Sequence, residues 1–136
     1  MRVILCVEDR GGMVFNERRV SRDREVIADI VKDMKGKSLF AEEYSKILFE
    51  GFECDVNYAE APLAKAKETD TCFVEREALS AYVDKIDAVT IYRWNRSYPW
   101  DKRLDIDLSA RGFRLVSTTD MVGYSHEKIT KEIYVK

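Results

Sequence analysis

Arginine and carboxylate side chains crowd the first 25 residues of the chain. The arginines are Arg10, Arg18, Arg19, Arg22 and Arg24, and the acids are Glu8, Asp9, Glu17, Asp23 and Glu25. Guanidinium groups suit phosphate and carboxylate ligands, and the start of a helix adds positive potential, so this segment is a candidate anion site. The acids match the arginines in number, however, and this local neutrality favours a solvated, internally paired surface.

A second group of candidates lies in residues 92–103, where aromatic and basic side chains alternate. Arg93, Trp94, Arg96 and Trp100 could stack bases and hold phosphates of a nucleic acid. At the period of two that strands have, the same aromatic residues could instead cover the sheet. The net charge of −2 argues against a general nucleic-acid binder, so the packing role is favoured.

The chain has one histidine and three widely spaced cysteines. His126 follows residues 123–125 in a predicted hairpin tip, and without a nearby Cys or Asp partner it is expected to be a turn residue rather than a general base. With a single histidine and no Cys-x-x-Cys pair, no metal site is predicted. Cys6 and Cys72 fall in predicted buried strands and are expected to be inert, and Cys54 lies between two acids that disfavour its thiolate.

The elements that would position these residues begin with a strand and a helix. Residues 3–7 are apolar and rich in β-branched side chains, which predicts a buried strand, and the two glycines that follow at 11 and 12 permit a sharp turn. Residues 13–16 are expected to continue the loop. A helix is then predicted from Ser21 as N-cap to Gly36 as its stop.

Strand and helix patterns alternate along most of the remaining chain. Further strands are predicted at residues 38–41, 55–59, 71–74, 88–95, 112–116 and 128–135, and further helices at residues 42–49, 62–67 and 76–82. This order predicts an α/β fold with a mostly parallel central sheet, an antiparallel C-terminal edge and helices on both faces.

Length and composition set the class of protein. At 136 residues, with 46% hydrophobic and 35% charged residues, the chain is expected to form a single domain, residues 1–136. No run approaches the roughly 18 apolar residues of a membrane helix, so no membrane contact is expected. Reduced, widely spaced cysteines are typical of a cytoplasmic protein.

Several segments together resemble dihydrofolate reductases over nearly the whole chain. The first strand with the following residues 9–16 resembles the family's first strand and mobile active-site loop. The strand at residues 88–95, the acidic crossover at 104–107 and the closing strands resemble its C-terminal unit. The resemblance implies a dihydrofolate reductase-like fold, shortened between residues 45 and 71.

The same resemblance implies that the family's cofactor contacts are missing. The family holds nucleotide phosphates at a glycine- and arginine-bearing helix start after its second strand and at paired glycines after a later strand. The corresponding residues here are 41–45 and 75–78, which are acidic and contain no glycine. Carboxylates repel phosphate groups, so NADPH is not expected to bind and no cofactor is predicted.

On the substrate side, the family has a carboxylate near the start of its first helix. The resemblance places Glu25 closest to that position, as a candidate catalytic acid, with Asp23 second; an acid there also simply stabilises a helix start. The ending at residues 125–132 resembles small dihydrofolate reductase-like chains of Firmicutes, some of which are called ribonuclease Z. One histidine cannot build the two-zinc site of that activity, which is therefore judged unlikely.

These considerations favour a non-catalytic or repurposed domain that binds a small anionic ligand or a protein partner. The candidate ligand-binding residues are Arg19, Arg22, Arg24 and Asp23, beside Glu25. Two alternatives stay open. One is an NADPH-dependent reductase with an altered cofactor mode, using Glu25 as acid and residues 13–16 as lid, and the other is an RNA-interacting accessory protein. The last strand, expected at a sheet edge, suggests a homodimer.

Overall fold

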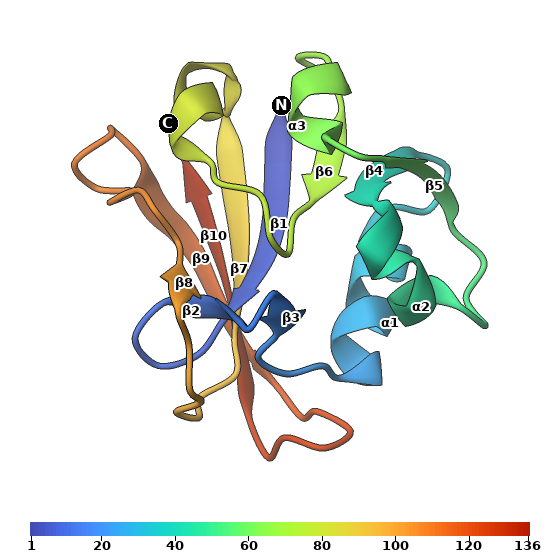
Figure 1. Ribbon diagram of the computed structural model, residues 1–136, viewed down its shortest axis with the longest axis vertical. Coiled ribbons are helices and arrows are strands. Elements are labelled where there is room, and N and C mark those ends of the chain that lie inside the picture. The colour runs from blue at the N-terminus through green and yellow to red at the C-terminus, as the bar shows by residue number, and fades with distance from the viewer.

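Apolar strands from both halves of the chain assemble into one seven-stranded sheet in the computed structural model, which describes residues 1–136 (Figure 1). Its strands are β1 (Arg2–Val7), β4 (Ser38–Glu42), β5 (Asp55–Ala59), β6 (Thr71–Phe73), β7 (Ala88–Arg93), β9 (Arg114–Met121) and β10 (Ile129–Val135). Their order is β5-β4-β6-β1-β7-β10-β9. The first five strands of this order run parallel, and β10 pairs antiparallel with both β7 and β9. The predicted sheet is confirmed.

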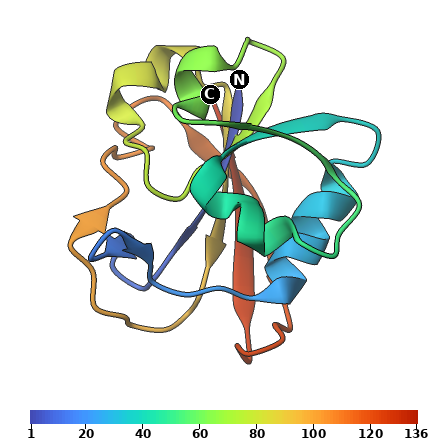
Figure 2. The ribbon, with the colours of Figure 1, turned by 45° about the vertical axis from the view of Figure 1, so that its right-hand side comes forward.

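Helices cover both faces of this sheet, as predicted. The helices are α1 (Arg24–Asp33), α2 (Lys46–Phe49) and α3 (Pro62–Lys65), with 3₁₀ helices η1 (Glu43–Ser45) and η2 (Ser80–Lys85). Because side chains alternate along a strand, Leu5 of β1 packs in the core under α3 and η2, whereas Ile4 packs in the core under α1 and α2. Figure 2 shows α1 and α2 beside each other.

A small second sheet lies beside the carboxyl end of β1 in Figure 1. It consists of β2 (Gly12–Phe15), β3 (Arg18–Arg19) and β8 (Lys102–Arg103), in the order β3-β2-β8. The prediction that residues 13–16 are a loop was therefore wrong. Asn16 and Glu17 have φ values of 50° and 63°, which is the backbone of a two-residue hairpin turn joining β2 to β3.

Three boundaries differ from the sequence prediction for identifiable reasons. The N-cap of α1 is Asp23 rather than Ser21, and its carboxylate accepts the Glu25 N–H at 2.9 Å. The helix predicted at residues 76–82 is instead η2, which starts later because the Asp105 carboxylate binds the N–H groups of Leu79 and Ser80.

The third boundary that differs is the end of the long strand predicted at residues 88–95. This strand ends at Arg93, since Asn95 has a left-handed φ of 57°.

The edge of the sheet also differs from expectation. The last strand, β10, is an interior strand, and β9 forms that edge with all but its last residue exposed. In the described chain, no helix has the length and apolar character needed to cross a membrane.

Candidate functional site

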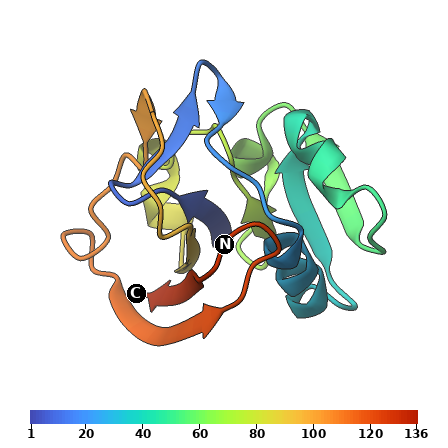
Figure 3. The same cartoon turned by 90° about the horizontal axis from the view of Figure 1, so that it is seen from below.

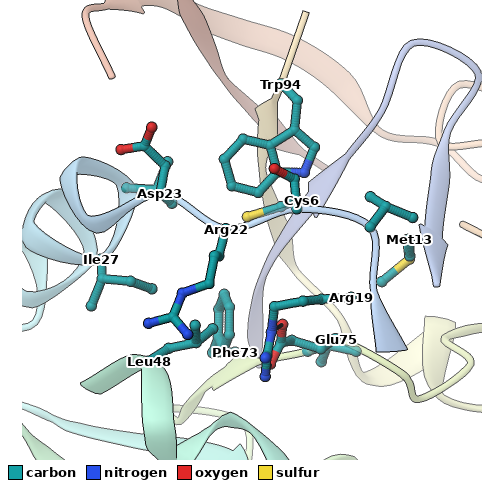
Figure 4. A pocket seen from close by; sticks show the side chains of 14 residues that line it. Cys6, Met13, Arg19, Arg22, Asp23, Ile27, Leu48, Phe73, Glu75 and Trp94 are labelled. Atoms are coloured by element: carbon teal, nitrogen blue, oxygen red, sulfur yellow. Dashed lines mark hydrogen bonds and ion pairs between the residues drawn. The ribbon is translucent and has the colours of Figure 1, made fainter. Parts of the chain in front are cut away.

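The carboxyl ends of parallel strands β1 and β6, together with Trp94 just after β7, surround a small cavity against α1 (Figure 4). Its volume is about 20 Å³, the room of a single water molecule. Most of its lining is apolar. Its polar side chains are Ser21, Arg22 and Asp23 of the segment between β3 and α1, together with Arg19 of β3 and Glu75 after β6, which pair with each other. In open α/β sheets, ligand sites form at this end of the strands, so the cavity is the first candidate site.

Asp23 is the centre of the polar network at the rim of the cavity. Its buried carboxylate accepts hydrogen bonds from the backbone N–H groups of Glu25, Tyr124 and Ser125 at 2.8–2.9 Å, and from His126 Nδ1 at 2.9 Å. Burial by itself raises the pKa of this carboxyl, but the hydrogen bonds overcome it and lower the pKa to about 2. Asp23 is therefore a carboxylate at neutral pH.

His126 lies between this carboxylate and two hydroxyl groups. Its Nε2 is 3.0 Å from Ser21 Oγ and 2.9 Å from Tyr98 Oη. Its ring stacks on Trp94, with 4.7 Å between centroids, and the residue is only 3% exposed. The expectation of an unpartnered turn residue was wrong. Asp23 is 103 positions away in the sequence, and only the fold brings the two together.

The hairpin loop between β9 and β10 lies beside the start of α1 (Figure 3), and Gly123 allows its close approach to Asp23. A Cβ atom on Gly123 would lie 2.7 Å from Asp23 Oδ2 and 2.8 Å from both the His126 carbonyl oxygen and Ile129 Cδ1. The residue is therefore required by close packing rather than by its backbone angles. The loop residues 122–128 are thus fitted closely onto the start of α1.

A second polar cluster lies where the resemblance to reductases placed the nucleotide phosphates. Arg19 forms a bidentate ion pair with Glu75 at 2.7 and 2.9 Å, and Ser45 donates a hydrogen bond to the same carboxylate at 2.7 Å. The Arg76 side chain pairs with Glu42 at 3.2 Å, and the Arg76 N–H also donates to Glu42 at 3.0 Å. Residues 41–45 and 75–78 are therefore neighbours. We call Arg19, Glu42, Ser45, Glu75 and Arg76 the carboxylate corner.

The aromatic ring of Tyr44 lies against both arginines of the carboxylate corner. The guanidinium carbons of Arg19 and Arg76 lie 4.2 and 4.0 Å from the ring centroid. The Tyr44 hydroxyl accepts the Arg19 N–H at 2.8 Å, and its carbonyl accepts from the Arg19 guanidinium at 3.2 Å. Each arginine is therefore held by a carboxylate and by cation–π contact with one ring.

The predicted anion-binding residues do not converge on one point. Arg19 lines the cavity but is committed to Glu75, whereas Arg22 lines it without any ion pair. In Figure 4 the Arg22 side chain extends toward Leu48. Arg24 lies 5.5 Å from the ring of Tyr124, outside the cavity.

Glu25, the candidate catalytic acid, is exposed and does not line the cavity. It occupies the first turn of α1, where its backbone N–H donates a hydrogen bond to the carboxylate of Asp23, the N-cap residue. The carboxylate at the rim of the cavity is Asp23, the second choice from the sequence. Glu25 therefore has the position of an acid that simply stabilises the helix start.

The four candidate nucleic-acid contacts also do not form one surface. Trp94 is only 3% exposed and packs on His126, and Arg93 is paired with Glu132. Trp100 is half-buried over Gly12, with Arg10 and Arg103 near its ring, and Arg96 is exposed. The inclusion of Trp94 was wrong, because its ring belongs to the core beside α1, as the packing interpretation had it.

The cysteines lie in environments that disfavour the thiolate. Burial, with the charges of Glu75 and Asp23, raises the pKa of Cys6 well above its usual range, although Cys6 lines the cavity. Burial raises the pKa of Cys72 to about 12. Burial and the charge of Asp55 raise the pKa of Cys54.

Comparison with known proteins gives a clear result for the fold alone. No protein-family model and no curated protein matches the sequence. Among solved structures, dihydrofolate reductase from Enterococcus faecalis, in complex with NADP(H) and RAB-propyl, superimposes with a TM-score of 0.68 over 98% of this chain and 94% of that chain. The chain has the dihydrofolate reductase fold. Sequence identity is only 12%, so the likeness carries no activity with it.

Proposed function

We propose that this chain is a repurposed domain of dihydrofolate reductase fold that binds a small anionic ligand beside α1 and does not use a nicotinamide nucleotide. The observation that carries the proposal is the carboxylate corner. The groups that would hold a phosphate there are already engaged with carboxylates.

Both arginines of the corner are unavailable to a phosphate. Glu42 and Glu75 are buried, so an incoming anion would meet two carboxylates at low effective dielectric and would have to break their ion pairs. The Arg76 backbone N–H, a group of the kind that binds phosphate, is used by Glu42 as well. A reductase of this fold without its hydride donor cannot reduce a substrate.

The cavity beside α1 retains the features of a binding site. Apolar side chains such as Leu48 and Phe73 line it, and the unpaired guanidinium of Arg22 lies at its margin. The backbone N–H groups of Ser21, Arg22 and Asp23 donate no hydrogen bond within the chain. A ligand with a small apolar body and one carboxylate or phosphate group matches this chemistry.

Ligand entry requires movement, because the cavity as it stands holds about one water molecule. The segment of residues 20–22, between β3 and α1, lines the cavity and belongs to neither element. We propose that this segment opens for the ligand. Residues 13–16, the lid in the alternative reductase hypothesis, are less suited to such a movement, because Met13 lies in strand β2, which is paired with β8.

A thermal-shift screen tests this proposal. NADPH, folates and small carboxylates and phosphates are added to the wild-type protein and to Arg22→Ala, with Arg111→Ala as a control at an exposed arginine outside the cavity. We expect a small anion at about 100 times its Kd to raise the wild-type Tm by roughly 5 °C or more. Arg22→Ala should lose this rise and Arg111→Ala should keep it. A comparable rise with NADPH would contradict the proposal.

A further inference from the structure

Ser21, His126 and Asp23 form a continuous row of hydrogen-bonded side chains at the cavity. Ser21 Oγ lies 3.0 Å from His126 Nε2, and His126 Nδ1 lies 2.9 Å from Asp23 Oδ2. A hydroxyl, an imidazole and a carboxylate in this sequence of contacts are the components of an activated serine nucleophile. Nothing in the small-ligand proposal above requires this order of groups.

The environment of His126 sets which nitrogen carries the proton. The Asp23 carboxylate only accepts hydrogen bonds, so the Nδ1–H points at it and the Nε2 lone pair faces the hydroxyl groups of Ser21 and Tyr98. Asp23 stays charged because three backbone N–H groups bind it. Stacking on Trp94 fixes the plane of the imidazole ring. The ring is therefore oriented as a base toward Ser21 Oγ.

Ser21 is the accessible end of this row. It is partly exposed and lines the cavity, whereas Asp23 and His126 are buried behind it. The free N–H groups of Arg22 and Asp23 follow Ser21 directly, and the residue after a nucleophile is a common source of an oxyanion-binding N–H. The Tyr98 hydroxyl lies 2.9 Å from His126 Nε2 and 3.3 Å from Ser21 Oγ, so it shares the Nε2 lone pair with Ser21, and the Ser21 proton must turn from Tyr98 to Nε2 for the attack.

We propose that Ser21 is a nucleophile that takes an acyl group from a small ester, with His126 as general base and Asp23 as positioning residue. Ser21 Oγ bonds to the carbonyl carbon while its proton passes to His126 Nε2. The bond from that carbon to the leaving oxygen then breaks, and His126 returns the proton to the leaving alcohol. Water, activated by His126, releases the acid and restores Ser21. The inference rests on the proposed function in one respect, that a small molecule reaches this cavity.

A small alkyl fluorophosphonate tests the nucleophile directly. Attack by Ser21 would form an Oγ–P bond and release fluoride, leaving a stable adduct that mass spectrometry assigns to one residue. In wild-type protein we expect labelling at Ser21 at least 100-fold faster than at Ser80 and Ser109, which are exposed serines without a histidine neighbour. Ser21→Ala should take no adduct, with an unchanged circular dichroism spectrum.

Two variants separate a reactive row from a merely structural one. Asp23→Asn keeps an N-cap side chain but favours the wrong imidazole tautomer, so labelling of Ser21 should slow by at least 100-fold in protein that is still folded. Tyr98→Phe keeps the Ser21–His126 contact and should still be labelled at Ser21.

Folded wild-type protein in which Ser21 reacts no faster than Ser80 and Ser109 would overturn the inference. This comparison needs no variant. A negative result leaves the proposed function standing whenever a small anion still raises the Tm. Labelling of Asp23→Asn at the wild-type rate would also overturn the role of the row.

Discussion

At the scale of single residues, Asp23 performs three tasks with one carboxylate. It caps α1 through Glu25 N–H, binds the hairpin loop through the N–H groups of Tyr124 and Ser125, and orients His126. A buried carboxylate with this many donors is stabilised in its charged form, which explains its low pKa. Its contribution to folding must therefore depend on pH.

We expect Asp23→Asn to lower the free energy of unfolding by about 2 kcal/mol at pH 7. This value follows from the pKa of the Asp23 carboxyl, which is 3.8 in the unfolded chain and about 2 in the folded one. Because the folded pKa is the lower of the two, this contribution is complete above about pH 4 and is lost as the pH falls toward 2. Urea denaturation across pH 2 to 7 measures it.

Asp84→Asn is the matched control, since Asp84 is exposed and makes no hydrogen bond or ion pair through its side chain. Its free energy of unfolding should stay within about 0.5 kcal/mol of wild type at each pH. If Asp23→Asn destabilised the protein equally at pH 2.5 and pH 7, the carboxylate charge would not be the cause.

At the scale of elements, the β9–β10 hairpin loop and the start of α1 form one unit. Its existence follows from sheet order, because β10 runs antiparallel to β7 and therefore begins where β7 ends, with Thr130 opposite Arg93. The turn before β10 must then lie at the carboxyl edge of the sheet, beside α1. Gly123 lets the two backbones approach closely enough for the contacts of Asp23.

Gly123→Ala should destabilise the protein by about 1–3 kcal/mol, since the added Cβ would overlap Asp23, His126 and Ile129 and force the loop to shift. The shift should also change the fluorescence of Trp94, which stacks on His126. Chemical denaturation followed by tryptophan emission reports both effects. Val122→Ala, at a side chain that is 77% exposed, is the neighbouring control and should leave both unchanged. A Gly123→Ala protein as stable as wild type would show that the loop is not closely fitted.

Much of this element-level organisation could be predicted from the sequence. The strand at residues 3–7, the helix ending near Gly36 and the closing antiparallel strands follow from hydrophobic periodicity and stop signals. The small sheet could not be predicted, because β3 and β8 contain two residues each. Strands that short have no readable period.

The candidate site was predicted only where it depended on local composition. Carboxylates at residues 41–45 and 75–78 are visible in the sequence, and the fold brings them together as the resemblance implied. The partnership of His126 with Asp23 was missed, since no local pattern joins residues 103 positions apart. One available signal was that the only histidine follows a glycine in the turn leading back to the sheet.

At the scale of the whole molecule, the chain combines the dihydrofolate reductase fold with the carboxylate corner and a small cavity beside α1. The superposition with the Enterococcus faecalis enzyme spans 98% of this chain, so the architecture is retained. In the carboxylate corner, Glu42 is paired with Arg76 and Glu75 with Arg19. A hollow of about 780 Å³ on the opposite face, bordered by Arg103 and Asp105, is wider but not enclosed by the β3–α1 segment.

Isothermal titration of the folded protein with NADPH tests this account most directly. Since both arginines of the corner are already paired, we predict no saturable heat up to about 1 mM NADPH, which corresponds to a binding free energy weaker than about −4 kcal/mol. A 1:1 isotherm with a Kd in the micromolar range would contradict the account, because it would require the carboxylate corner to open and accept phosphate.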